Sequence, residues 1–390
     1  MFNIQVEKEA LAEALNDISS TIGANVNGLG DDCISLKDNG NYILDIYTTN
    51  TIEFSKISLA IANGSSGKAE QMPYINFKRF KTMIDSIPDG EYVNIKSSVN
   101  DIEITYGTRK KPLKLSGATN GMMQLPQFNS QNTISIDRKV ISKALNDICS
   151  IIKDDSNNVI SNCMRIYANG FDVEITAMDT KYSRMYMYST KQSDANIGEV
   201  LVEANKLKKA FKLFERFNSI SFETNGTITK IYGTDPLSNS QMFMTAEYYV
   251  RSLSGNFPKN ISVMFGQGVE FSKINKAEII ASISRADAIE DNVIGSGTLE
   301  LAIKDDMVNI VKTSQYGVVE DSFSAENVIN TPIKDMFKAK ALIDVVKCMS
   351  DQNVQIGRLP NASCYVVKDG STSSQGSFII SAVNANIQTP

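Results

Sequence analysis

The chain has 390 residues, of which 42% are hydrophobic and 21% are charged, as is typical of a globular protein with two or three domains. Its formal charge of −5 excludes a wholly basic nucleic-acid coat but leaves room for a local basic face. The sequence has no histidine, which excludes Ser-His-Asp and Cys-His catalysis and two-histidine metal sites. We therefore expect no enzyme activity, no cofactor and no metal.

The five cysteines are widely spaced and include no Cys-x-x-Cys pair: Cys33, Cys149, Cys163, Cys348 and Cys364. This pattern argues against a disulfide framework or a zinc site and favours a reducing compartment. The N-terminus becomes acidic within nine residues, and no run of 18 apolar residues occurs. We expect a cytoplasmic protein that does not contact a membrane.

Short segments of the first third of the chain recur in the second third. The pentapeptide Ala14–Ile18 returns 130 residues later as Ala144–Ile148. Other matches follow in the same order: Cys33 with Cys163, Asn39-Gly40 with Asn169-Gly170, and Tyr106-Gly107-Thr108 with Tyr232-Gly233-Thr234. Four matches in one order indicate a tandem duplication.

A third copy is indicated by apolar residues at helical spacing. The first helix of each copy is predicted from Leu11, Leu15 and Ile18, then Ile141, Leu145 and Ile148, then Ile279, Ile283 and Ala286. The second helix is predicted from Phe77, Phe80, Ile84 and Ile87, then Leu207, Ala210, Phe214 and Phe217, then Ala339, Leu342, Val346 and Met349. The expected domains are residues 1–127, 128–256 and 257–390.

Alternating segments between these helices predict strands. In the first copy they are Cys33–Leu36, Tyr42–Tyr47, Ile52–Leu59, Tyr92–Lys96 and Asp101–Tyr106. Asn39-Gly40 and Pro88-Asp89-Gly90 predict turns. The fold class is therefore α+β, with three tandem domains that each pack two helices on antiparallel sheet.

Three such domains resemble the bacterial-type sliding clamp, the β subunit of DNA polymerase III. The start Phe2-x-Ile4-x-Val6, with Leu11 after it, resembles the opening of the clamp. The other similar segments are Thr49–Glu53, Met178–Tyr182, Phe77–Gly90, Phe257-Pro258 with Val263, and Ser377–Val383. The resemblance covers residues 1–383, and its eroded motifs suggest a divergent member, for which a phage genome is one source.

Other motifs favour different functions less well. Gly64–Lys68 looks like a phosphate-binding loop, but Ala62 and Ala69 stand where Gly and Ser or Thr are needed. The pairs Asp31-Asp32, Asp154-Asp155 and Asp305-Asp306 lie at predicted turns, where solvated carboxylates are the simpler interpretation. A metal-dependent nucleic-acid enzyme stays an alternative, as does a structural protein that has kept the fold but is not loaded on DNA.

Basic residues gather on the predicted helices of this acidic protein. Only the first helix is acidic, through Glu7, Glu9, Glu13 and Asp17. The residues predicted to face double-stranded DNA are Lys78, Arg79, Lys81, Arg138, Lys139, Lys143, Lys206, Lys208, Lys209, Lys212, Arg216, Lys273, Lys276, Lys338, Lys340 and Lys347. Arg285 lies on the predicted first helix of the third copy. The resemblance implies a homodimeric ring that slides on DNA without reading its sequence.

The resemblance also implies a cleft that takes short peptides of a DNA polymerase and a clamp loader. Carried over by position, its walls would be Met178, Thr180, Tyr182, Ser183, Pro258, Val263, Ile379 and Ser381. Lys181 and Ser183 stand where the family usually has His and Leu, and Ser381 stands where it has Met. We therefore expect a shallower, more polar cleft with its own peptide preference.

Overall fold

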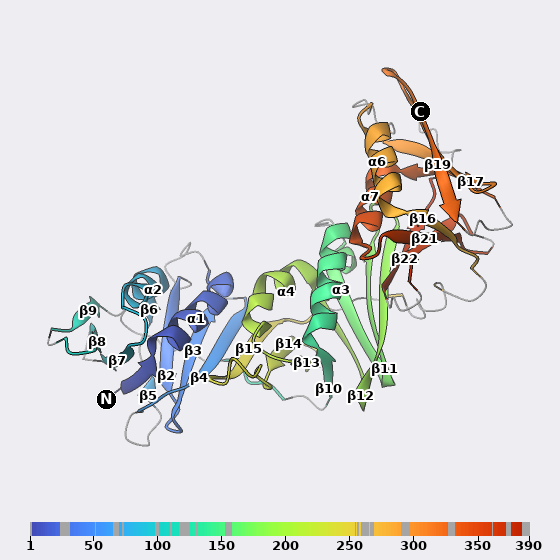
Figure 1. Ribbon diagram of the computed structural model, residues 1–390. Helices are drawn as coiled ribbons and strands as arrows, with labels where there is room; N and C mark the ends of the chain where they lie inside the picture. Colours follow the sequence, from blue (N-terminus) through green and yellow to red (C-terminus); the bar gives the residue numbers. More distant parts are fainter. Residues whose placement is uncertain are drawn as a thin grey trace. The chain divides into compact units, whose positions relative to one another are not determined.

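The computed structural model describes residues 2–23, 32–50, 52–64, 70–71, 74–97, 101–109, 111–116, 125–129, 132–152, 158–253, 255, 257–258, 265, 269–289, 297–326, 332–360, 362–371 and 376–383 (Figure 1). The chain forms two compact units. Unit 1 holds residues 1–142 and 196–253, and unit 2 holds residues 143–195 and 254–390. The division runs through the expected middle domain, so the boundaries at 127 and 256 stay a prediction. We call the three expected segments the first, middle and third repeats.

The described residues contain six α-helices. They are α1 (Lys8–Ile18), α2 (Phe77–Asp85), α3 (Arg138–Ile151), α4 (Ala204–Ala210), α6 (Lys276–Asp287) and α7 (Ala339–Cys348). Short 3-10 turns are η1 (Ser19–Thr21), η2 (Val159–Asn162) and η3 (Phe211–Phe214). The apolar residues at helical spacing on the first helix of each repeat are buried, as for Leu11, Leu15 and Ile18, whereas Phe77 on α2 is half-buried. Asn76 and Asn275 cap α2 and α6 by accepting backbone N–H bonds.

Unit 1 contains two antiparallel sheets. The first has the order β1 (Asn3–Glu7), β7 (Tyr92–Ser97), β8 (Asp101–Tyr106) and β9 (Leu113–Ser116). The second has the order β10 (Thr133–Asp137), β13 (Ser219–Thr224), β14 (Ile228–Gly233), β15 (Phe243–Arg251), β4 (Phe54–Ala60), β3 (Ile43–Thr49), β2 (Cys33–Asp38) and β5 (Glu70–Gln71), with β6 (Ile75–Asn76) also on β2. The pairing of β15 with β4 makes one sheet from two repeats.

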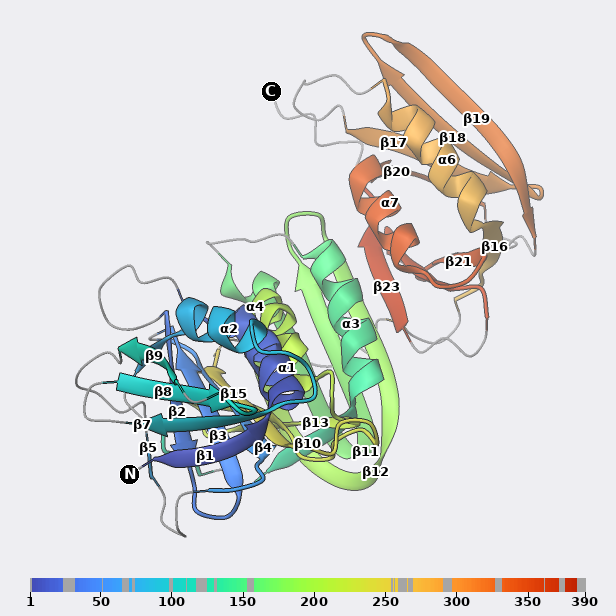
Figure 2. The same ribbon diagram turned by 60° about the vertical axis from the view of Figure 1, so that its left-hand side comes forward.

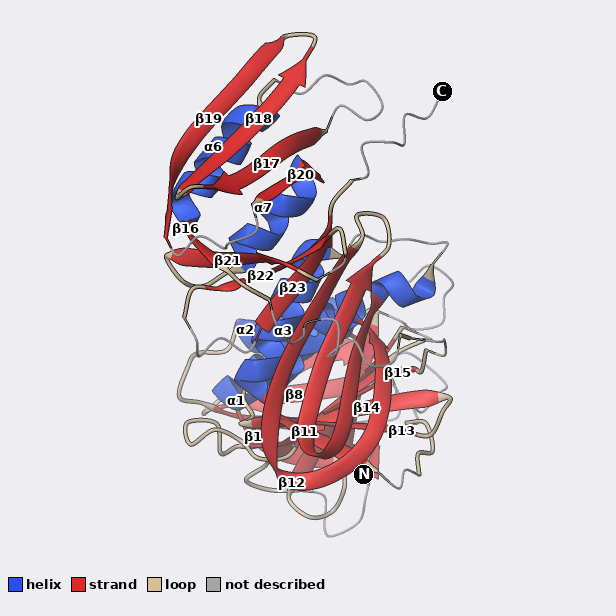
Figure 3. Cartoon of the chain, turned by 90° about the vertical axis from the view of Figure 1, so that its right-hand side faces the viewer, coloured by secondary structure: helices blue, strands red, loops and turns tan. Residues whose placement is uncertain are grey.

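Unit 2 contains one ten-stranded sheet. Its order is β11 (Cys163–Asp179), β12 (Arg184–Glu203), β23 (Gly376–Ser381), β22 (Cys364–Asp369), β21 (Asn353–Arg358), β16 (Ser272–Asn275), β19 (Gly317–Glu326), β18 (Met307–Ser314), β17 (Thr298–Lys304) and β20 (Ile333–Lys338). Helices α6 and α7 pack together beside these strands (Figure 2). Strands β18 and β19 form a long hairpin next to β17 (Figure 3). The pairing of β12 with β23 again joins two repeats.

Strand pairing fixes the register between the repeats. In each repeat the residue two before the first helix pairs with the strand that follows the second helix: Val6 with Val93, Ile136 with Ile220, and Ile274 with Val354. Val93 and Ile220 are 127 residues apart. Phe77 is therefore equivalent to Ala204, the start of α4, and not to Leu207 as the sequence comparison assumed. The apolar spacing of the sequence fits both positions, and only the pairing distinguishes them.

The turns expected from sequence are present where they are described. Gly40 and Gly90 both have φ of 81°, which glycine adopts at no steric cost. Asp305 and Asp306 form the turn between β17 and β18. The loop 65–69 and the pair at 154–155 lie outside the described residues, and so do Asp31 and Val263.

Candidate nucleic-acid interface

The helices present a group of exposed cations. Nine of the sixteen basic residues predicted to face DNA are exposed: Lys78, Arg79, Lys139, Lys208, Lys209, Lys212, Lys338, Lys340 and Lys347. Lys78 and Lys340 both occupy the second position of their helix, α2 and α7. These side chains can supply the phosphate contacts that sequence-independent DNA binding requires.

The densest group lies on α4 and η3. Lys208, Lys209 and Lys212 are exposed, whereas Leu207 and Phe211 on the same segment are buried. The apolar side therefore fixes the segment against the protein and leaves three lysines directed toward solvent.

The other seven predicted residues bond within the chain. Their partners are Asp85 for Lys81, the Phe217 carbonyl for Arg138, Asp147 and Ser350 for Lys143, Glu203 for Lys206, Glu13 and Asp17 for Arg216, Glu326 for Lys273, and the Met349 carbonyl for Lys276. Their role in DNA binding stays a prediction, and the exposed nine are the stronger candidates.

The acidic character of α1 has a structural cause. Glu9 accepts a bond from the Gly90 N–H at the turn before β7. Glu13 and Asp17 bind Arg216 at N–O distances of 3.0 and 2.6 Å. Burial raises the pKa of the Asp17 carboxyl, and Arg216 opposes that rise. Glu13 and Asp17 therefore serve packing between the first and middle repeats, whereas Glu9 serves packing within the first repeat.

We call the contact of the first and middle repeats in unit 1 the Arg216 junction. Strands β4 and β15 pair from Phe54 to Leu59, and Arg216 lies 4.6 Å from the ring centre of Phe243. The Arg216 side chain keeps 25% of its surface exposed. This junction combines a backbone ladder with a half-exposed ion pair.

We call the contact of the middle and third repeats in unit 2 the Arg184 junction. Strands β12 and β23 pair from Arg184 to Tyr188. The Arg184 side chain is fully buried and binds Asp179 at 2.7 Å and Asp344 at 3.3 Å. It also donates to the carbonyl of Ile151 at the end of α3. One guanidinium therefore ties β11, β12, α3 and α7 together.

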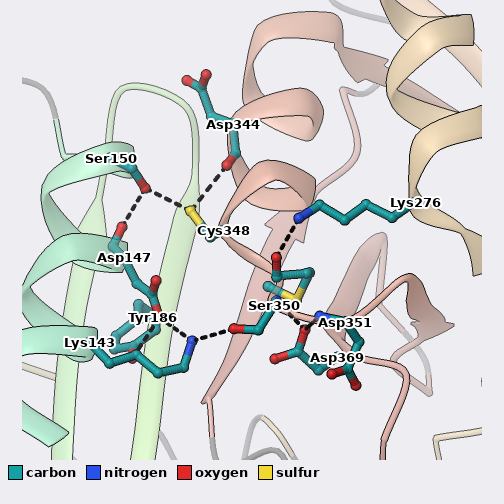
Figure 4. Close-up of polar contacts among 11 residues, drawn as sticks. Lys143, Asp147, Ser150, Tyr186, Lys276, Asp344, Cys348, Ser350, Asp351 and Asp369 are labelled. Carbon is teal, nitrogen blue, oxygen red and sulfur yellow. Dashed lines mark hydrogen bonds and ion pairs between the residues drawn. The ribbon is translucent and has the colours of Figure 1, made fainter. Parts of the chain in front are cut away.

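A polar network extends along the Arg184 junction (Figure 4). The Tyr186 hydroxyl donates to Asp147 over 3.2 Å, and Lys143 binds both Asp147 and Ser350. Ser150 lies 2.7 Å from the Cys348 sulfur. Burial raises the pKa of the Cys348 thiol to about 11, so this cysteine stays protonated and unreactive at neutral pH.

The predicted cleft residues are partly brought together. Ile379 pairs with Met185, and the Ser381 N–H donates to the Ser183 carbonyl. Tyr182 is half-buried, and Lys338 lies 5.2 Å from its ring centre. Their function as a peptide site stays a prediction.

Three other predicted cleft residues are not part of this strand pairing. The Thr180 hydroxyl lies 2.7 Å from that of Ser161. Met178 and Pro258 are half-buried.

The sequence did not predict most of the apolar residues around Ile379. Ile379, Val366 and Leu359 form a buried cluster, against which pack Met185, Phe265, Val269, Phe271, Ala362 and Cys364. Lys368 lies 3.8 Å from the ring centre of Phe271, and burial lowers the pKa of its amine. The alternation of Ser183, Arg184 and Met185 could have shown that Met185 points to the same face as Ser183.

The described residues offer neither a metal-binding cluster nor a membrane-spanning helix. Across the described residues, no three Cys, Asp or Glu side chains group so that they could hold a metal ion. None of the described helices has the length and apolarity needed to cross a membrane.

Comparison with known proteins agrees with this architecture. Residues 132–249 match the family model of the DNA polymerase III beta subunit, N-terminal domain. That match falls on the middle repeat, as expected if the repeats share one fold. No curated protein sequence matches the chain.

Solved structures match over nearly the whole chain. The beta subunit of DNA polymerase from Streptococcus pyogenes is 15% identical with a TM-score of 0.81, covering 98% of this chain and 100% of that one. The DnaN sliding clamp of Pseudomonas aeruginosa bound to griselimycin is 13% identical with a TM-score of 0.80, covering 98% and 99%. At such identities the likeness establishes the fold, and the resemblance seen in the sequence is confirmed at that level. Nothing in these matches bears on a phage source.

Proposed function

We propose that this chain is a DNA sliding clamp, a processivity factor that surrounds duplex DNA and tethers a replicative polymerase. The observation that carries the proposal is the joining of repeats by edge-to-edge strand pairing, β4 with β15 and β12 with β23. Among the described residues, β9 ends its sheet and β19 pairs from Gly317 to Ser324 with β18 alone, so each has an open strand edge. Those edges are the means by which further copies extend the series.

The proposed action is topological and involves no bond making or breaking. Exposed lysines such as Lys208, Lys209 and Lys212 would contact phosphates, directly or through water. Because these contacts do not read bases, the clamp can move along DNA while it remains linked to it.

The proposed assembly is a head-to-tail homodimer. Two chains of three repeats supply six domains with two equivalent joints. Light scattering at micromolar concentration should give twice the chain mass of 42.9 kDa. A mass of one chain or of three chains would contradict this assembly.

DNA retention tests the function directly. Wild-type protein loaded on nicked circular DNA by its clamp loader should remain bound and should leave after linearisation. The triple variant Lys208→Glu, Lys209→Glu, Lys212→Glu should bind more weakly and with a shallower salt dependence, because fewer counterions are released. Binding to linear and circular DNA with equal lifetime would contradict a clamp.

A matched control separates the helical cations from net charge. The variant Lys191→Glu, Lys304→Glu, Lys334→Glu makes the same charge change at exposed positions on strands. It should retain DNA as the wild type does. Equal loss in both triple variants would show that overall charge, and not the α4 surface, governs binding.

The proposed partners are peptide segments of a DNA polymerase and a clamp loader. Ile379 is only 2% exposed, so a charge there would test folding instead of binding. Met185 is half-buried against the same cluster, and Ser381 is half-buried with its hydroxyl 3.4 Å from the Cys364 sulfur. Titration of the cognate polymerase's C-terminal peptide against Met185→Asp, Ser381→Asp should show weakened affinity in a protein that remains dimeric. Unchanged affinity would place the partner site elsewhere.

A further inference from the structure

The joint between two chains can be specified by internal symmetry, if the proposed function is accepted as the premise. In each repeat a ladder of paired residues starts four positions before the first helix. The ladders are Ile4–Ile95–Ile104–Leu113, Ile134–Phe222–Ile231–Tyr248 and Ser272–Ile356–Val367–Phe378. Leu113, Tyr248 and Phe378 are therefore equivalent.

Two of these equivalent residues pair with the preceding repeat. Tyr248 pairs with Ser55, and Phe378 pairs with Tyr186. In the described part of the chain, Leu113 has no such partner, because β9 is the end of its sheet.

The residue that should meet Leu113 follows from the other sheet of each repeat. Cys33 pairs with Asn76, the residue before α2, and Thr298 pairs with Lys338, the residue before α7. Three positions further along the chain, two ladders start: Leu36–Ile46–Ile57 and Leu301–Ile310–Asp321. Ile57 and Asp321 are thus equivalent, and so are Ser55 and Val319. The joint should pair β19 with β9 of a second copy, with Val319 opposite Leu113.

The exposed apolar residues near this edge agree with such a joint. Tyr316, in the turn before β19, is 70% exposed, and Val318, the second residue of β19, is 62% exposed. On the described surface of β19, residues Gly317 to Ser324 pair only with β18.

A second equivalence relates the contacts of the helices at both junctions. Val93, Ile220 and Val354 are equivalent residues, and the residues four positions before them, Asp89, Arg216 and Ser350, are therefore equivalent too. At the Arg216 junction it meets the sixth and tenth residues of α1, Glu13 and Asp17. At the Arg184 junction Ser350 meets the sixth residue of α3, Lys143, over 3.2 Å (Figure 4).

We infer that the ring is closed by a salt bridge of reversed polarity, between Arg285 of one chain and Asp89 of a second copy. Arg285 is the tenth residue of α6, where α1 has Asp17 and α3 has Asp147. Asp89 stands where the middle repeat has Arg216. The acid and the base of the Arg216 junction have exchanged places.

Both groups are available for this contact. The Arg285 side chain is 57% exposed and uses Nε and Nη2 on Asp321, which leaves other N–H donors. The Asp89 side chain is 80% exposed beside Lys8. An acid and a base with this exposure can pair without a large desolvation cost.

The reversal gives the joint its specificity. If the third repeat met the middle repeat of another chain, Arg285 would face Arg216 and the two would repel. Contact between two like charges disfavours the wrong partner, whereas the native joint pairs opposite charges. The third repeat therefore selects the first repeat of a second copy.

The experiment uses two charge-reversal variants of the full chain, Arg285→Asp and Asp89→Arg. Alone, each places like charges at both joints, so its dimer dissociation constant should rise about a hundredfold. An equal mixture should form a dimer, because one joint is then native and the other is exchanged. Analytical ultracentrifugation at low micromolar concentration measures both results, and Lys304→Asp is the control that should dimerise normally.

The outcomes separate this inference from the proposed function. A dimeric, DNA-retaining wild type whose single variants keep the wild-type dimer dissociation constant would overturn the reversed pair and leave the clamp intact. The double variant Arg285→Asp, Asp89→Arg restores opposite charges at both joints and should dimerise. The reversed pair would also be overturned if the single variants stayed monomeric after mixing and the double variant stayed monomeric as well. A wild type that stays monomeric and does not hold DNA would overturn both.

Discussion

The two junctions inside the chain use the same backbone ladder but different polar contacts. The Arg216 junction has an arginine with a quarter of its side chain exposed, bound to two acids of α1. The Arg184 junction has an arginine with no exposed side-chain surface, bound to Asp179 and Asp344. Exposed ion pairs contribute little to stability, whereas breaking a buried one leaves a costly unpaired charge. Strand pairing therefore defines both junctions. The burial of its arginine decides how much the stability of each junction depends on that side chain.

The largest effect is expected at the buried arginine. Arg184→Met should lower the free energy of unfolding of unit 2 by about 3–5 kcal/mol, because Asp179 and Asp344 are left without their cation. Urea denaturation measures this loss. The triple variant Arg184→Met, Asp179→Leu, Asp344→Leu should recover most of it, and a single variant that loses less than about 1 kcal/mol would contradict the comparison.

A smaller effect is expected at Arg216, the partly exposed arginine. Arg216→Met should cost about 1 kcal/mol, since the pair with Glu13 and Asp17 is partly solvated and the methionine keeps contact with Phe243. The same urea titration serves as the measurement. A loss as large as that of Arg184→Met would mean that exposure does not distinguish the junctions.

The smallest effect is a change in pH dependence that both junctions should share. Burial raises the pKa of Asp17 and of Asp147 above the ordinary value of 3.8. The folded protein then holds these protons more tightly than the unfolded chain. Their contribution to stability is therefore full below pH 3.8 and is lost as the pH rises through the folded pKa.

Removing either carboxyl should flatten that slope. Unfolding midpoints of Asp17→Asn and Asp147→Asn, measured across this acidic range, should depend less on pH than the wild-type midpoint. Glu278→Gln, an exposed acid on α6, is the control that should keep the wild-type slope. Parallel curves for all four proteins would refute the shared effect.

Sequence periodicity predicted most of the fold because the apolar spacing in the first helix of each repeat fits only one helix position. Leu11, Leu15 and Ile18 all proved buried on α1. The second helix of the middle repeat was less determined, since its apolar spacing fits starts at Ala204 and at Leu207. Long-range strand pairing decides between them, and periodicity carries no information about it.

The functional surfaces were harder to predict for the same reason. A lysine spacing identifies a helix face, as for Lys208 and Lys209, but not an acid that reaches it from another repeat. Arg216 was predicted to face DNA, yet Glu13 and Asp17 bind it from more than 190 positions away. The cluster around Ile379 likewise depends on which strands are neighbours, and Phe265 gave no signal of it in the sequence.

The open edges of β9 and β19 carry a consequence for what the chain can build. They are different surfaces, so the proposed joint is heterologous, and such a joint makes a closed object only if the turns between successive repeats complete a circle. In the proposed ring of two chains there are six repeats, so each step must supply about one sixth of a full turn. The Arg184 guanidinium holds one of these steps. A substitution that changed the angle there, while β9 and β19 still paired, would produce an open helical filament in place of a ring.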